Sequence, residues 1–339
     1  MIFINGVQFL SDSSSIEQGH ELVNALLEHP DLVSASRSFC AIPERKYIGG
    51  SQESKCVYVF QREYATVDPS LVQYVGTDEA TTCVGIVIRN CSSGMVSIAH
   101  LDTLDVVEIG ISQMLSLISD TDDDDDAILD VHLVGAFDDS APQVREGNDR
   151  KRGYSFPLCI KIVKKLEESK VKFQIQNFQV LKNNTRWDSE GNAYPIFHGL
   201  LMETCKGSVV PGSFDTGTRC PDEMIRRIRL GASFVDPTLT GRLLDTYHTQ
   251  TDRFLIPPFS WSMRQVRIAM VMKHRSDMEI LLTTSTSPSA ECPHFVETQK
   301  RVWEYLIQHP DWREAFPSKL PRVFQRTATA SWSMSYSQT

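Results

Sequence analysis

Two runs rich in valine and isoleucine lie on either side of a short polar cluster, and they constrain the fold of this chain more than any other feature. The cluster covers residues 90–93. β-Branched residues around Asn, Ser and Gly indicate two strands joined by a turn. If Arg89 pairs with Gly94 across that turn, the same register places Cys83 directly opposite His100.

A cysteine opposite a histidine is the minimum arrangement for an activated nucleophile. Directly opposed residues have Cβ atoms about 4.5–5.5 Å apart, which brings the imidazole of His100 within reach of the Cys83 thiol. An imidazolium would stabilise the thiolate and later protonate a leaving group. The alternative is a structural cysteine, because cysteine is among the most buried residue types and this chain has eight. A one-residue register slip would also turn one of the pair to the other face.

The composition is that of an ordinary globular protein and narrows the functional classes. Hydrophobic residues make up 41% and charged residues 23% of the 339 residues. A net charge of −9 argues against binding nucleic acid, which requires clustered Lys and Arg. The cysteines form no C-x-x-C pair and no zinc-like spacing with histidine, so we expect no metal site. We also expect reduced thiols, no membrane segment, and a location in the cytoplasm, with the nucleus as a second compartment.

Further along the chain, strand and helix patterns mix irregularly. Apolar residues at helical spacing predict a helix over 106–119, whereas residues 128–136 are typical of a buried strand. The five aspartates at 122–126 predict a solvated loop, because calcium loops alternate their ligands with other residues. The mixed order predicts an α+β fold with mixed or antiparallel sheets and helices on the outer faces. We expect a single catalytic domain over 1–324 and a disordered Ser/Thr-rich tail over 325–339.

The residues around Cys83 resemble a known enzyme family. Residues 78–83 are similar to the nucleophile segment of the protein N-terminal asparagine amidohydrolases, and further stretches match that family in the same order. These stretches are 58–63, 131–135, 137–139, and 285–288 together with 293–297. A more distant likeness is to bacterial glutamine deamidases of chemoreceptors and necrotizing toxins. Those enzymes have layered α/β sandwich folds, and they pair a cysteine with a histidine 17 residues later and a threonine six residues earlier, as in this chain.

The resemblance implies a mechanism and a substrate. Cys83 would be the nucleophile, His100 the acid and base, and Thr77 the residue that orients His100. On chemistry alone, Asp78 and Asp102 are alternatives to Thr77. The substrate would be a protein or peptide with asparagine at its free N-terminus. Its side-chain amide would be hydrolysed to aspartate with release of ammonia, without a metal or organic cofactor.

Sparing internal asparagines requires recognition of the free α-ammonium, which is expensive to bury without a carboxylate. The acids near the hairpin are Asp78, Glu79, Glu63 and Asp102. We favour Asp78, although each of them also fits a solvated surface charge. Ser287 and His294 lie in the late matched stretches and are expected to line the site from across the fold. The alternative for these two is an ordinary helix-entry loop.

Two other functions fit the same residues. A glutamine deamidase or transglutaminase-like enzyme acting on internal residues would use the same Cys83 and His100. A non-catalytic protein that captures N-terminal residues would keep Cys83 only as a buried side chain. The family resemblance favours the amidohydrolase. It implies a part in protein turnover, because an N-terminal aspartate is the better acceptor for arginylation, and we expect the protein to act as a monomer.

Overall fold

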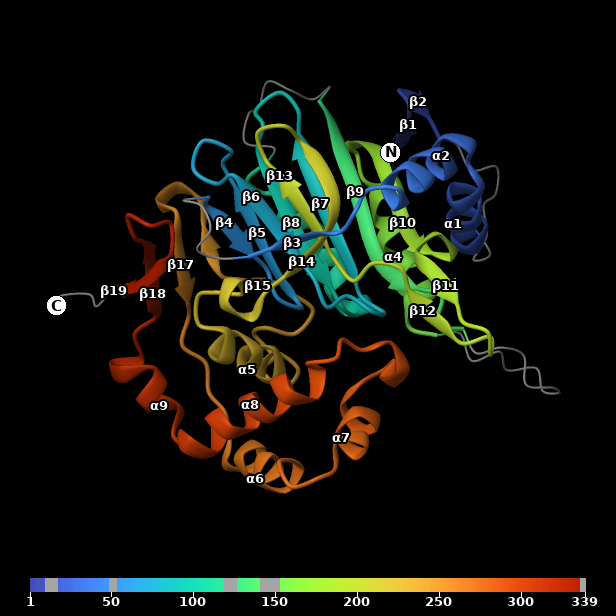
Figure 1. Ribbon diagram of the computed structural model, residues 1–339. Helices are drawn as coiled ribbons and strands as arrows, with labels where there is room; N and C mark the ends of the chain where they lie inside the picture. Colours follow the sequence, from blue (N-terminus) through green and yellow to red (C-terminus); the bar gives the residue numbers. More distant parts are fainter. Residues whose placement is uncertain (10–17, 49–53, 119–126, 141–152, 336–339) are drawn as a thin grey trace.

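The computed structural model describes residues 1–9, 18–48, 54–118, 127–140 and 153–335. Its centre is an eight-stranded mixed sheet (Figure 1). In spatial order its strands are β15 (Leu244–Asp245), β5 (Glu63–Val67), β8 (Val96–Leu101), β7 (Val84–Asn90), β9 (Ile128–Phe137), β10 (Lys172–Leu181), β1 (Ile2–Ile4) and β2 (Val7–Gln8). The continuous apolar strand predicted over 128–136 is β9, which lies between β7 and β10.

A second sheet contributes to the site. Its five strands are β3 (Arg45–Tyr47), β14 (Ser208–Phe214), β13 (Leu200–Glu203), β6 (Tyr74–Thr77) and β4 (Cys56–Tyr58). Two smaller sheets are β16 (Tyr247–His248), β17 (Arg253–Ile256), β18 (Arg322–Arg326) and β19 (Trp332–Ser335), and β11 (Thr185–Trp187) with β12 (Ala193–Pro195).

Helices pack on the outer sides of these sheets. The first group is α1 (Gln18–Glu28), α2 (Pro30–Cys40), α3 (Val107–Leu115) and α4 (Ser155–Glu168). The second group is α5 (Glu223–Ser233), α6 (Met263–Met272), α7 (Asp277–Thr284), α8 (Phe295–Gln308) and α9 (Trp312–Ala315), and it forms the lower part of Figure 1. The α+β class with mixed sheets and outer helices is therefore confirmed. Among the residues described, no helix combines the length and apolar composition needed to cross a membrane.

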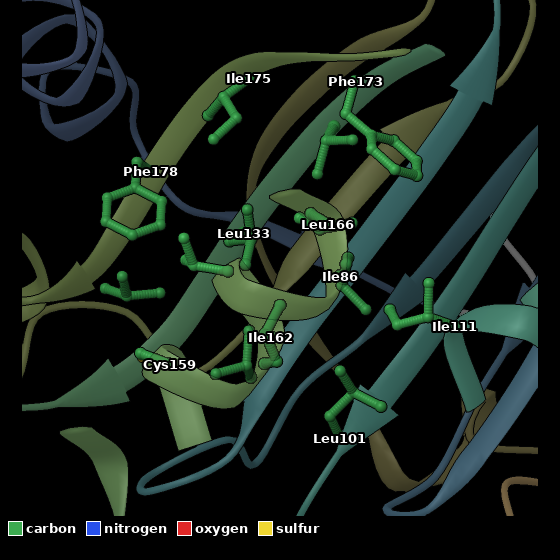
Figure 2. Packing of buried hydrophobic residues seen from close by; sticks show 14 of the residues in the cluster. Ile86, Leu101, Ile111, Leu133, Cys159, Ile162, Leu166, Phe173, Ile175 and Phe178 are labelled. Carbon is green, nitrogen blue, oxygen red and sulfur yellow. The ribbon is translucent and has the colours of Figure 1, made fainter. Parts of the chain in front are cut away.

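Alternation along β7 separates two hydrophobic layers. Ile86 faces the helices and packs in one cluster with Ile162 and Leu166 of α4 (Figure 2). Val87 points the other way and belongs to the cluster that includes Leu200 of the second sheet. Successive strand residues face opposite sides, so the odd-numbered residues around β7 point toward the second sheet. This parity decides where Cys83 lies.

The β7–β8 hairpin exists, but its predicted register was wrong by two residues. Arg89 pairs with Val96, and Gly85 pairs with His100. The loop is longer than expected because the Asn90 side chain accepts hydrogen bonds from the backbone of residues 92 and 93, while the Asn90 backbone N–H donates to the Met95 carbonyl. A shift of two preserves the face of each side chain. Cys83 is therefore diagonal to His100 on the same face, instead of directly opposite it.

The C-terminal stretch also differs from the prediction. Strand β18 pairs with both β17 and β19. The Arg326 guanidinium lies 4.1 Å from the centre of the Trp332 ring, which packs edge-on against Phe254 at 4.7 Å. These aromatic and cation–π contacts stabilise an ordered hairpin. The disorder expected over 325–339 is thus wrong through Ser335.

Two predicted features lie outside the described residues and stay predictions. They are the disorder of residues 336–339 and the solvated loop formed by the aspartate run at 122–126. Within the described part, the helix expected over 106–119 is shorter, since α3 ends at Leu115.

Gly135 is the glycine of β9 on which the position of Cys83 depends. Its φ is +126°, and an added Cβ would lie 2.5 Å from the Cys83 carbonyl oxygen. We expect Gly135→Ala to lower the free energy of unfolding by about 2 kcal/mol or more, through backbone strain and displacement of Cys83. Urea denaturation measures the change. Gly231→Ala in α5 is the control, because nothing lies within 4 Å of its added Cβ and alanine favours a helix. Equal stability of the two variants would contradict the prediction.

Candidate active site

His100 on β8 is held by one hydrogen bond from the neighbouring sheet. Its Nδ1 lies 2.8 Å from Oγ1 of Thr77, the last residue of β6, and both side chains are buried. The opposed residue is Gly85, where an added Cβ would lie 3.1 Å from the Thr77 methyl carbon. The space beside Gly85 is thus filled by Thr77. Nε2 of His100 is buried and has no hydrogen-bond partner among the described residues.

Cys83 lies immediately before β7 and is only 8% exposed. Its carbonyl accepts a 2.7 Å hydrogen bond from the Ala136 backbone, which fixes it against β9. Burial raises the pKa of the Cys83 thiol, and the charges of Asp102 and Glu291 raise it further. Burial also lowers the pKa of His100 to about 4. Both shifts favour the uncharged forms of the two groups at neutral pH over the imidazolium–thiolate pair considered from sequence.

Asp78 begins the segment that leads from β6 to Cys83, and its carboxylate is fully engaged. It accepts hydrogen bonds from the Tyr58 hydroxyl at 2.7 Å, the Phe214 backbone N–H at 2.8 Å and Arg219 Nη2 at 2.9 Å. Burial raises the pKa of Asp78, while Arg219 opposes that rise. Thr77, and not Asp78, is the residue hydrogen-bonded to Nδ1 of His100. Its contacts are those of an anchor for the segment.

Glu79 is the next residue and adopts a left-handed backbone with φ of 62°. Its carboxylate is hydrogen-bonded to Arg219, to Arg227 Nη2 at 3.0 Å and to His294 Nε2 at 3.2 Å. Burial alone would raise its pKa, but His294 and the two arginines hold the pKa of Glu79 well below its ordinary value. The structure therefore brings Glu79 and His294 together. Glu79 also contacts Arg219 and Arg227, which the sequence analysis did not identify. No local pattern marks these arginines, because they follow about 140 residues later.

The remaining acids near the hairpin also face arginines. Asp102 accepts hydrogen bonds from Arg62 Nε at 3.1 Å and from Thr103, and Glu63 is paired with Arg226 in a fully buried salt bridge. Asp102 is thus bound to Arg62, and Thr77 is the residue bonded to the ring of His100.

The late matched stretch lies against the Cys83 segment through Thr286. The Thr286 hydroxyl is 3.1 Å from the hydroxyl of Thr82, the residue before Cys83. Ser287 is buried, and its Oγ has no partner among the described residues. A buried hydroxyl without a partner is rare enough to mark a position that a ligand can satisfy. Within the described residues no group of three His, Cys, Asp or Glu side chains is placed to hold a metal ion.

Comparison with known proteins identifies relatives over the whole of this region. A family model described as protein N-terminal asparagine amidohydrolase matches residues 48–334. A protein N-terminal asparagine amidohydrolase from Arabidopsis thaliana is 46% identical over 98% of this chain and 99% of its own length. The protein of the same description from Homo sapiens is 29% identical over 75% of both chains, and that from Mus musculus is 28% identical over 81% and 83%. Every site residue named above lies in the matched range.

Arg219 neutralises two acids at once, so its removal should be costly. Arg219→Met would leave Asp78 buried without a cation, and we expect a loss of about 3–5 kcal/mol in the free energy of unfolding at pH 7, measured by urea denaturation. The loss should shrink toward pH 5, since protonated carboxyls need no cation. Arg313→Met is the control, because its pair with Asp311 is exposed and contributes less than about 1 kcal/mol. Similar losses in both variants would refute the argument.

Proposed function

The chain belongs to the protein N-terminal asparagine amidohydrolase family, and from this premise we propose that it hydrolyses the side-chain amide of N-terminal asparagine through a Cys83 thioester. The observation that carries the proposal is the hydrogen-bonded Thr77–His100 pair on the face of the sheet that also holds Cys83. Within the described residues, Nε2 of His100 has no hydrogen-bond partner, which leaves it available to exchange a proton with the thiol or the substrate.

Attack begins from the neutral pair. Nε2 of His100 takes the thiol proton while Sγ of Cys83 bonds to the amide carbon, and the amide oxygen becomes an oxyanion. The C–N bond then breaks, and the leaving nitrogen takes the proton from His100 and departs as ammonia. The thioester remains on Cys83. A water molecule, deprotonated by His100, adds to the thioester, and the sulfur leaves with that proton to regenerate the thiol and release aspartate.

Thr77 selects the tautomer of His100 in this scheme. When Nδ1–H donates to Thr77 Oγ1, Nε2 carries a lone pair and acts as the base. Backbone N–H groups of Thr82 and Cys83 would stabilise the oxyanion, since they lie beside the nucleophile. A buried site strengthens both interactions because water does not compete for the same groups.

The remaining candidates divide into two groups. Ser287, with its unpartnered hydroxyl, contacts the substrate, and His294 lines the site through its bond to Glu79. Asp78, Glu79 and Asp102 are already paired with arginines, so their role is to stabilise the structure around the site. The proposal needs no metal or organic cofactor. It places the protein as a monomer in the cytoplasm and nucleus, where its aspartate product enters protein turnover.

A set of four peptides tests the proposal directly. They begin with Asn, Gln or N-acetyl-Asn, or carry Asn only internally, and ammonia release and the mass of each product are measured. We expect conversion of the free Asn peptide alone, and none by Cys83→Ala. One methylene in a pocket is worth only about 1–3 kcal/mol, so rejection of Gln also reports how the ammonium is fixed. Turnover of Gln or blocked peptides would indicate the broader deamidase, and no turnover by folded, reduced protein would favour a binding protein.

Thr77 provides a second test, aimed at the tautomer. Thr77→Val keeps the shape but removes the hydroxyl that holds His100, so we expect kcat to fall about 10- to 100-fold with little change in KM, equivalent to a hydrogen bond of 1.5–3 kcal/mol. Thr77→Ser retains the hydroxyl and should preserve most of kcat. Steady-state kinetics of the two variants decide the matter. Equal loss in both would mean that Thr77 acts through packing.

A further inference from the structure

One carboxylate near Cys83 has no cation. Asp78, Glu79 and Asp102 each face an arginine, whereas Glu291 takes part in none of the ion pairs found within the described residues. Its carboxylate is hydrogen-bonded to Ser285, and the next residue, Thr286, lies 3.1 Å from the hydroxyl of Thr82, which precedes Cys83. In keeping with this position, the charge of Glu291 is among the causes that raise the pKa of the Cys83 thiol. A partly desolvated carboxylate that lacks a positive partner favours a cationic ligand.

Glu291 is held in place by a rigid turn. It follows the 3-10 turn Pro288–Ala290, in which the Ala290 N–H donates to the Ser287 carbonyl at 2.9 Å. The Ala290 carbonyl lies 3.1 Å from His198 Nε2, and the His198 carbonyl accepts from the Ala80 backbone at 2.8 Å. This chain of bonds joins the turn to the segment that carries Cys83. The turn that carries Glu291 is therefore held against the segment that carries Cys83.

The side chain of Glu291 is suited to bind a cationic ligand. Glu291 is half-buried, and the Ser285 hydroxyl donates to Oε1. Burial raises the pKa of Glu291 to about 7, against the effect of Ser285, and the charge of Glu79 raises it further. A positive ligand would remove this electrostatic penalty. An ammonium group is suited to it, since it can donate to a carboxylate while leaving the Ser285 contact intact.

We propose that Glu291 binds the α-ammonium of the substrate's first residue and so confines the enzyme to free N-termini. This inference rests on the proposed function and assigns its specificity to one residue. With the ammonium on Glu291 and the amide carbon at Cys83, the span between the two groups is fixed by the protein. Asparagine is selected when its side chain matches that span, and a blocked N-terminus places an uncharged amide against the carboxylate.

The assignment also predicts a pH dependence. The titratable groups that face Glu291 are Cys83, Cys292 and Glu79, and His198 lies behind it on the Ala290 carbonyl. Burial raises the pKa of Cys292 to about 12, and the pKa of Glu79 is lowered, so neither changes charge near neutrality. Because only the ionised carboxylate attracts an ammonium, kcat/KM rises as pH increases through about 7. It falls again as the substrate's own α-amino group, with an ordinary pKa near 7.7–8.0, loses its proton.

A comparison of two substrates across the wild type and three variants tests the proposal. The substrates are an Asn-initiated peptide and the same peptide with a succinamoyl group in place of Asn, which lacks only the α-ammonium. We expect the wild type to prefer the Asn peptide strongly in kcat/KM. Glu291→Gln should lose about 30-fold or more on the Asn peptide and little on the succinamoyl peptide, so that the preference collapses. Its kcat/KM should also lose the rise near pH 7.

The controls separate the possible failures. Glu297→Gln removes an exposed acid in the first turn of α8 and should behave as the wild type. Glu291→Asp should retain the rise with pH at a higher KM. Equal turnover of both substrates by the wild type, which requires no variant to fold, would overturn the assignment to Glu291 but not the amidohydrolase itself. A Glu291→Gln enzyme that keeps the full preference would do the same. Absence of any turnover by the wild type would overturn both proposals.

Discussion

The position of Cys83, the proposed nucleophile, depends on Arg219, which binds two consecutive acids at the start of the segment between β6 and β7. Asp78 and Glu79 are neighbours in sequence, so their charges would repel if both were buried without a cation. A single guanidinium contacts both, and Tyr58 and Phe214 supply further hydrogen bonds to Asp78. A buried ion pair contributes little net stability but selects one arrangement strongly, because any other arrangement leaves a charge unpaired. We infer that the role of Arg219 is to fix the conformation of the segment that leads to Cys83.

Burial then sets the chemistry of the fixed pair. Cys83 and His100 lie between two sheets, where desolvation opposes ionisation of both. A thiolate that is present at rest is open to oxidation and to stray electrophiles, whereas a neutral thiol gains nucleophilic character only when His100 accepts its proton. Thr77 makes this possible by holding Nδ1, and Gly85 makes room for Thr77. In the proposed mechanism, Thr77 and Gly85 thus decide which nitrogen of His100 takes part in proton transfer.

Sequence reasoning succeeded where the information is local. The Val/Ile runs predicted the hairpin, and parity placed Cys83 and His100 on one face even though Asn90 lengthens the loop and shifts the register by two. The tail failed because its order comes from distant partners, such as Phe254 against Trp332. Arg219 and Arg227 carry no local signal and were missed for the same reason. Glu291 was overlooked although it lies between two matched stretches, and its lack of a cation is visible only in three dimensions.

The distribution of charge around the nucleophile explains how a chain of net charge −9 can contain a selective cation site. Acids alone would make many weak sites for any ammonium, including lysine side chains. Here the acids of the hairpin region are neutralised by arginines, and among the described residues Glu291 remains beside the Cys83 segment without an ion-pair partner. Selectivity therefore arises from the acids that are already paired as much as from the one that is not. The small exposure of Cys83 acts in the same direction, because a chain end brings one flanking peptide to the thiol, whereas an internal residue must bring two.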